Sequence, residues 1–125
     1  EPRGLPRLEA LLENWHRWAR GTTSLAGGCL FVTAAVEFDD RPGPVRDVLV
    51  DSQRQWLRTL ARAARIAVDE GHLKSEIDPD QLAFELYSFM LGSHHYFRLL
   101  GDGRALKRAE EGFSRLVQTY RTRSE

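Results

Sequence analysis

Between Glu85 and Arg98 the sequence carries no formal charge, although its pattern predicts one continuous helix over 78–100. Asp78 and Pro79 predict the helix start, because an aspartate side chain accepts an orphaned backbone N–H and proline needs no N–H at the first helical position. A helix that is apolar nearly all round has to be covered nearly all round. The uncharged segment is far shorter than the roughly 20 residues that span a bilayer, so we expect protein to cover it.

The faces of this expected helix differ in character. At helical spacing its main apolar face carries Leu82, Leu86, Met90, Phe97 and Leu100. Apolar side chains that point to other sides are Phe84, Phe89, Leu91 and Tyr96. The remaining stripe is formed by Glu85, Ser88, Gly92, His95 and Leu99. Small residues four apart lie on one side of a helix, so we expect a second helix to approach closely at this stripe.

The size of the chain, 125 residues, predicts one domain over 1–125 with a core of its own. Lys plus Arg and Asp plus Glu number 18 each, and this zero net charge argues against direct DNA contact by the chain.

Cys29 is the only cysteine, which excludes an intrachain disulfide and indicates a reducing, cytoplasmic location. No signal peptide or membrane span is recognised, so no membrane partner is expected. Because the sequence begins at Glu1 rather than Met, we expect an upstream part to be missing.

Four further segments predict helices. Residues 5–19 place leucines and two indoles on one face. Residues 29–38 suit a short buried helix, with a buried strand as the alternative because Phe, Val and Thr favour strands. A long helix is expected from about Pro44 to Glu70, closed by a glycine at position 71, and a last helix from Arg104 to about Arg121. The predicted fold is all-α, a five-helix bundle with antiparallel neighbours.

The long helix and the last helix are both amphipathic. The expected inner face of the long helix carries Val45, Leu49, Trp56, Leu60, Ala63 and Ala67. Its expected outer face carries Asp47, Asp51, Arg54, Arg58, Arg62, Arg65 and Asp69. The arginines are interpreted as a solvated face, because acidic residues alternate with them at helical spacing. The apolar stripe of the last helix is Ala105, Leu106, Ala109, Phe113, Leu116, Val117 and Tyr120.

Histidines are the first candidates for chemistry. Glu13 and His16 form one Glu-x-x-His pair, whereas a di-iron bundle needs two such pairs, so no metal is predicted. His94 and His95 point about 100° apart on a helix and do not easily chelate one ion. The two are interpreted as hydrogen-bonded helix histidines, although one of them could face the interior and the other a partner.

No recognised catalytic motif is present. The sequence has no Gly-rich phosphate loop, nucleophile elbow or paired-carboxylate motif. Cys29 is interpreted as a small buried thiol. We therefore predict that the chain is not an enzyme and needs no cofactor. A metalloenzyme built on His16, His94 and Glu37 is the alternative with the least support.

Aromatic side chains are numerous for a small domain and fall on predicted inner or partner-facing surfaces. Most are expected to be core. Concave sites lined by aromatic groups and a few polar ones are also how proteins hold small molecules, and Glu37, Tyr87 and His94 are candidates for the polar groups.

The run Gly27–Asp47, GGCLFVTAAVEFDDRPGPVRD, resembles the C-terminal domain of tetracycline-repressor-type (TetR family) transcriptional regulators. The downstream segment AVDEGHLKSEIDPDQLAFELYSFMLGSHHY and the final helix are similar too, so the resemblance covers nearly the whole chain. In that family an N-terminal helix-turn-helix domain binds operator DNA, and the C-terminal helices form an effector pocket and a dimer interface. The resemblance implies a ligand-sensing, dimerising half of a repressor, with operator DNA bound only through a missing N-terminal domain.

The resemblance also implies site residues. The last two helices would pair with their copies in a four-helix homodimer interface made by Ser88, Gly92, His95, Leu99, Phe113, Val117 and Tyr120. The walls of a pocket for an unknown small hydrophobic or aromatic effector would be Trp15, Phe31, Trp56, Leu60, Tyr87 and His94. The alternative is a purely structural helical dimerisation module without a ligand site.

Overall fold

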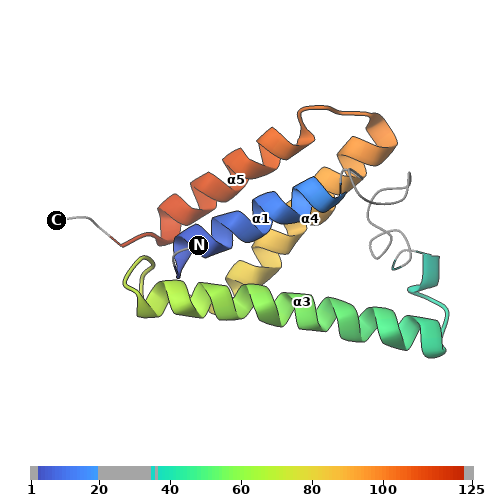
Figure 1. Cartoon of the computed structure of the whole chain (residues 1–125), viewed down its shortest axis with the longest axis horizontal. Helices are drawn as coiled ribbons and strands as arrows, with labels where there is room; N and C mark the ends of the chain where they lie inside the picture. The colour runs from blue at the N-terminus through green and yellow to red at the C-terminus, as the bar shows by residue number, and fades with distance from the viewer. Residues whose placement is uncertain (1–2, 20–34, 36, 123–125) are drawn as a thin grey trace.

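The computed structural model describes residues 3–19, 35 and 37–122. In that part it has four helices and no strand: α1 (Leu5–Ala19), α3 (Pro44–Asp69), α4 (Pro79–Leu100) and α5 (Ala105–Tyr120) (Figure 1). The predicted all-α class is confirmed. The predicted count of five helices is not, because the segment 29–38 lies largely outside the described residues, and only its residues 35, 37 and 38 are seen as helical.

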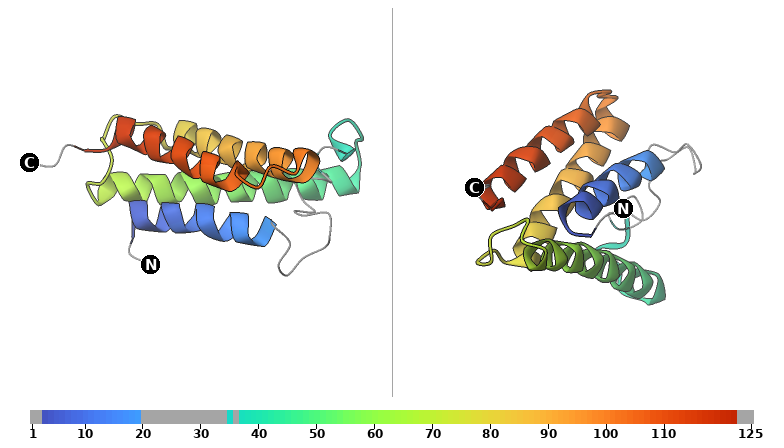
Figure 2. Two further views of the ribbon diagram at one scale, coloured as in Figure 1. Left: turned by 90° about the horizontal axis from the view of Figure 1, so that it is seen from above. Right: turned by 60° about the vertical axis from the view of Figure 1, so that its left-hand side comes forward.

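Helix α4 is the centre of the arrangement. It packs against α3 on one side and α5 on another, while α1 packs against both α3 and α4 (Figures 1 and 2). In the described part of the chain, no helix has the length and apolar character needed to cross a membrane. The buried residues of α4 are Leu82, Ala83, Leu86, Tyr87, Met90 and Ser93.

The helix ends form where the sequence predicts them. Asp78 Oδ1 accepts the backbone N–H of Asp80 at 2.9 Å, and Pro79 is the first residue of α4. At the end of α3, Gly71 adopts a positive φ of 79°, a conformation that glycine reaches without a Cβ penalty. This turn lets the N–H of His72 reach the carbonyl oxygen of Ala67 at 2.9 Å, which satisfies one orphaned carbonyl group of α3.

The core lies where α1, α3 and α4 meet and is closed by α5. Its largest fully buried side chains are Leu8, Leu60, Leu73, Leu82, Leu86 and Met90. Burying one such side chain contributes about 1.5–3 kcal/mol to folding. On α3 the buried positions facing the core include Ala63, Ala64 and Ala67, whose small side chains let neighbouring helices approach closely.

Two positions predicted to face inward are exposed instead. Val45 on α3 is 52% exposed and Leu100 on α4 is 61% exposed, so both predictions are wrong. The end of α3 lies beside the start of α4, and the two helices diverge from there (Figure 1). Val45 near the start of α3 and Leu100 at the end of α4 therefore lie where the two helices are far apart. The predicted outer face of α3, from Asp47 to Asp69, is exposed as expected.

Candidate functional site

Three helices meet at an aromatic cluster that contains two of the predicted pocket residues. Trp15 of α1 and Tyr87 of α4 pack edge to face, with ring centroids 6.3 Å apart and planes at 83°. The Tyr87 hydroxyl donates to Gln53 Oε1 of α3 at 2.5 Å. Both rings are buried, so the pair contributes about 0.5–1.5 kcal/mol beyond the apolar area it removes from water. The structure thus brings together Trp15 and Tyr87, two of the predicted pocket residues, and adds Gln53, which the sequence did not single out.

Trp56 lies one turn after Gln53 on α3 and packs against the core. Its indole Nε1 is buried and has no hydrogen-bond partner in the described structure. Leaving such a donor unpaired costs about 1–3 kcal/mol. One turn further along, Leu60 is fully buried. Two of the predicted wall residues are therefore inside the protein, and one of them carries an unused hydrogen-bond donor.

The other predicted polar groups lie in different surroundings. His94 is half-buried on α4, and burial, followed by the nearby Arg98 and His95, lowers its pKa below the ordinary value. Phe31 lies outside the described residues. Glu37 is exposed and pairs with Arg41, its carboxylate Oε1 3.7 Å from the guanidinium Nη2, so it does not join the interior cluster.

Metal ligands do not gather in the described structure. Within residues 3–19, 35 and 37–122 there is no group of three or more His, Cys, Asp or Glu side chains placed to hold one ion. The side chain of His16, part of the least supported alternative, lies outside the described structure, as does Cys29.

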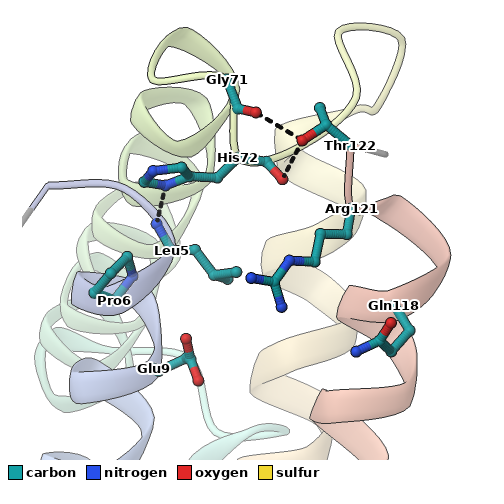
Figure 3. A pocket seen from close by; sticks show the side chains of 8 residues that line it. All are labelled: Leu5, Pro6, Glu9, Gly71, His72, Gln118, Arg121 and Thr122. Atoms are coloured by element: carbon teal, nitrogen blue, oxygen red, sulfur yellow. Dashed lines mark hydrogen bonds between the residues drawn. The ribbon is translucent and has the colours of Figure 1, made fainter. Parts of the chain in front are cut away.

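A cleft of about 730 Å³ opens where the start of α1, the turn after α3 and the end of α5 come together (Figure 3). Glu9 of α1 and Gln118 of α5 stand on its walls, and the Arg121 guanidinium reaches across it toward α1 (Figure 3). A groove of about 400 Å³ between α1 and α5 shares these residues and continues along the two helices. Sequence reasoning missed the cleft because its walls come from three segments that no local motif connects.

A third hollow, of about 330 Å³, lies between α4 and α5 and includes Ser88 and Gly92 from the predicted dimer interface. None of these three hollows is lined by any of the six predicted pocket residues.

One face of α4 is exposed and apolar. Phe84 is 65% exposed and Leu99 70%, and Leu91 lies exposed between them. Ser88 and His95 share this face at helical spacing and are also exposed. We call this face the α4 stripe; it consists of Phe84, Ser88, Leu91, His95 and Leu99. Three of the predicted dimer residues therefore lie on surface that is open to a partner.

Most of the other predicted dimer residues make contacts within the chain itself. Phe113 and Val117 are only 4% and 6% exposed, because α5 turns its apolar stripe onto the chain's own core. The structure thus corrects the expectation that these two side chains face a partner.

Tyr120 is half-buried and donates to Glu85 Oε1 at 3.1 Å. Desolvation and that carboxylate raise the pKa of Tyr120 above its ordinary value. Gly92 is half-buried, with free space beside it.

The model of the family described as "Tetracyclin repressor-like, C-terminal domain" matches residues 4–113 of this chain. The chain belongs to this family. The TetR resemblance seen in the sequence is therefore confirmed, and the chain is a regulator domain of TetR type. No curated protein sequence matches it.

The crystal structure of a TetR transcriptional regulator from Chloroflexus aurantiacus J-10-FL has a similar fold, with a TM-score of 0.86 and 22% sequence identity. The alignment covers 98% of the present chain and 62% of that regulator's chain. At this identity the likeness establishes the fold of the TetR-type domain, and the domain spans less than two thirds of the regulator that it resembles.

Proposed function

We propose that this chain is the ligand-sensing and dimerisation domain of a TetR-type repressor, with 1–125 acting as one domain and operator DNA bound by a separate N-terminal domain. The family match supports the regulator assignment. The zero net charge agrees with a chain that does not itself hold DNA. As a transcriptional regulator without an enzymatic role, the protein would act in the cytoplasm.

The buried Trp56 Nε1–H carries the ligand proposal. Buried donors in proteins are nearly always paired, and the acceptor group of a bound molecule is one way to pair the Trp56 N–H. Trp56 packs against the core cluster that includes Trp15, Leu60 and Tyr87, whose side chains are apolar or aromatic. A small, partly aromatic effector with one hydrogen-bond acceptor fits that chemistry, because the acceptor would pair with the indole N–H while the rest contacts the rings.

Such an effector would act by shifting the populations of two helix arrangements. It has to bind one arrangement more tightly than the other, by about 1–3 kcal/mol in ordinary allosteric systems. The aromatic cluster joins α1, α3 and α4 through Trp15, Gln53 and Tyr87. A ligand beside that cluster would change how α1 and α3 pack on α4, and α4 carries the exposed stripe proposed as the dimer face.

The α4 stripe carries the homodimer proposal. Large apolar side chains exposed together on one helix face, here Phe84, Leu91 and Leu99, mark an interaction site more often than scattered single residues do. A second copy packed on this stripe would bury more than about 1,200 Å² in total if the dimer is stable. The hollow beside Ser88 and Gly92 would provide space for a side chain of the partner.

The ligand site is tested with 8-anilinonaphthalene-1-sulfonate, which joins an aromatic body to an acceptor group. We expect saturable fluorescence enhancement with one dye per chain, weakened by Trp56→Phe, which removes only the indole N–H and part of the ring. Tyr96→Phe on the exposed part of α4 is the matched control and should leave the affinity unchanged. Binding without saturation, or equal affinity in the Trp56 variant, would contradict the ligand site.

A dimerisation module without a ligand site is the second candidate. It agrees with the burial of Trp15, Leu60 and Tyr87, which pack together in the core of the chain. This alternative predicts a native mass spectrum with dimers and no dye adducts, whereas the sensing domain predicts dimers that carry up to two dye molecules.

A further inference from the structure

The cleft in Figure 3 is framed by hydrogen bonds between segments that are far apart in the sequence. The backbone N–H of Lys74 donates to the carbonyl oxygen of Tyr120 at 2.8 Å, and the N–H of Thr122 donates to that of His72 at 3.2 Å. Arg121 lies between Tyr120 and Thr122 in the chain, so its backbone is fixed beside the turn that follows α3.

The start of α1 is fixed to the same turn on the opposite side of the cleft. The Leu5 backbone N–H donates to Nδ1 of the His72 imidazole at 3.1 Å (Figure 3). Gly4 permits this approach, because its φ is 92° and a Cβ there would lie 2.5 Å from His72 Nδ1. Both walls are therefore anchored to one turn, and a ligand would meet a cleft that is already formed.

Three polar side chains face the space between these walls. The Glu9 carboxylate points into it from α1, and the Gln118 amide and the Arg121 guanidinium point into it from the end of α5 (Figure 3). Within the described part of the chain, none of the three side chains has a hydrogen-bond or ion-pair partner. Glu9 and Arg121 carry opposite charges and do not pair with each other, so the space between them is open to a molecule that contacts both.

We propose that this cleft binds a free amino acid with an apolar side chain. A guanidinium presents a planar fork of N–H donors that matches a carboxylate, so Arg121 would hold the α-carboxylate of the ligand. The Glu9 carboxylate would accept from the α-ammonium group, and the Gln118 amide can both donate and accept. A zwitterion gives a partner to both charges of the cleft, whereas a simple acid or a simple amine leaves one of them without a partner.

The hollow next to the cleft favours an apolar side chain on the ligand. The groove of about 400 Å³ between α1 and α5 shares the three polar residues of the cleft and is also lined by Leu12, Phe113 and Val117. An aliphatic side chain placed along this groove would gain free energy by leaving water. Glu13 and Glu110 also line the groove, and their negative charges disfavour an amino acid with a second carboxylate.

This site goes beyond the proposed function and does not rest on it. Neither the cleft nor the groove is lined by Trp15, Trp56 or Tyr87, the aromatic residues proposed to hold the effector. The two sites also differ in chemistry, because the cleft presents two opposite charges.

An NMR titration of the amide signals of the unmodified chain tests the site with three compounds that share one carbon skeleton. L-leucine carries both charged groups, isocaproate lacks the ammonium group, and isoamylamine lacks the carboxylate. We expect L-leucine to shift the signals of the cleft residues Leu5, Gly71 and Thr122 in a saturable manner. The two analogues should bind about tenfold more weakly, because each loses one charge-assisted contact. Equal affinity for all three compounds, or no saturable shift with L-leucine, would overturn the proposal.

Variants of the two charged residues test the role of each. Arg121→Gln should weaken L-leucine binding about tenfold and leave isoamylamine unchanged, while Glu9→Gln should weaken L-leucine about tenfold and leave isocaproate unchanged. Arg115→Gln and Glu111→Gln are the matched controls, since they make the same charge changes at an exposed pair on α5 whose Nη2 and Oε2 atoms lie 3.9 Å apart. Both controls and Trp56→Phe should keep the affinity for L-leucine. Unchanged affinity in Arg121→Gln and Glu9→Gln, or an equal loss in the controls or in Trp56→Phe, would place leucine elsewhere and contradict the site.

Discussion

Phe89 on α4 occupies the space that a side chain at position 112 on α5 would need: a Cβ there would lie 2.7 Å from Cε1 of the ring. The close approach of α4 and α5 thus depends on Gly112. Gly92, which the sequence suggested for a close helix contact, has no atom within 4 Å of its would-be Cβ. The glycine that permits close helix packing within the chain is therefore Gly112 on α5, and not Gly92 on α4.

Gly112→Ala should lower the free energy of unfolding by about 1 kcal/mol, because crowding against Phe89 outweighs the roughly 1 kcal/mol that alanine gains in helix propensity. In a Phe89→Leu background the crowding is removed, and the same change should stabilise the protein. Urea unfolding of the four chains in this double-mutant cycle measures the difference. Equal effects in both backgrounds would show that the two residues do not interact.

Tyr87→Phe should cost about 1 kcal/mol of stability, because it leaves the Gln53 side-chain oxygen without the hydroxyl donor. Tyr96→Phe removes an equal hydroxyl from a half-exposed ring and should cost almost nothing, since Tyr96 is 52% exposed. Thermal or urea unfolding compares the two. If both variants lose the same stability, the hydrogen bond between Tyr87 and Gln53 contributes nothing.

Trp56→Phe should change the free energy of unfolding by less than about 1 kcal/mol, a small effect for a tryptophan packed against the core. Truncation of a large core side chain is ordinarily destabilising, but here it also removes the unpaired Nε1 donor, which offsets the loss. Trp15→Phe is the comparison and should cost more, because Trp15 is buried and packs on Tyr87. An equal loss in both variants would indicate that the Trp56 N–H has an acceptor in solution.

Local sequence rules predicted the helix ends well and the outcome of long-range packing less well. Asp78 and Gly71 set a helix start and a helix stop through hydrogen bonds to residues only a few positions away, so the sequence alone reveals them. Helical spacing also identified which residues share a face of α3. It does not say where two helices diverge, and for that reason Val45 and Leu100 were misplaced.

The candidate site residues show the same difference between local patterns, which the sequence reveals, and long-range contacts, which it does not. Helical spacing places Trp15 and Tyr87 on inner faces, and aromatic residues on inner faces tend to meet in a small core. The partner Gln53 and the bond from Leu5 to His72 join residues 34 and 67 positions apart, and no pattern in the sequence connects them. Phe113 and Val117 were assigned to a partner because periodicity marks an apolar face without saying whether the same chain covers it.

Acidification should destabilise the domain partly through His94. Burial, Arg98 and His95 all lower the pKa of this half-buried imidazole in the folded protein, so below about pH 6.5 the unfolded chain takes up a proton more readily. The contribution of neutral His94 to the free energy of unfolding is fully present above the pKa that His94 has in the unfolded chain. It is lost as the pH falls toward the lower pKa that His94 has in the folded chain. His94→Gln should flatten that part of the curve of unfolding free energy against pH, and His95→Gln should flatten it less. An unchanged slope in His94→Gln would mean that this imidazole titrates alike in the folded and unfolded chains.

Leu99→Arg should separate the proposed homodimer, because it puts a charge into the apolar contact at the C-terminal end of the α4 stripe, where Leu99 is 70% exposed in the single chain. The change suits the C-terminal end of a helix, so the fold itself should not suffer. Val48→Glu is the matched control: Val48 is 63% exposed on α3, outside the stripe, and an acidic residue suits that N-terminal part of the helix. Sedimentation equilibrium at micromolar concentrations should find a dimer for the unmodified chain and for Val48→Glu, and a monomer for Leu99→Arg. A dimer that survives Leu99→Arg would place the interface on another face, and a monomeric unmodified chain would remove the homodimer from the proposed function.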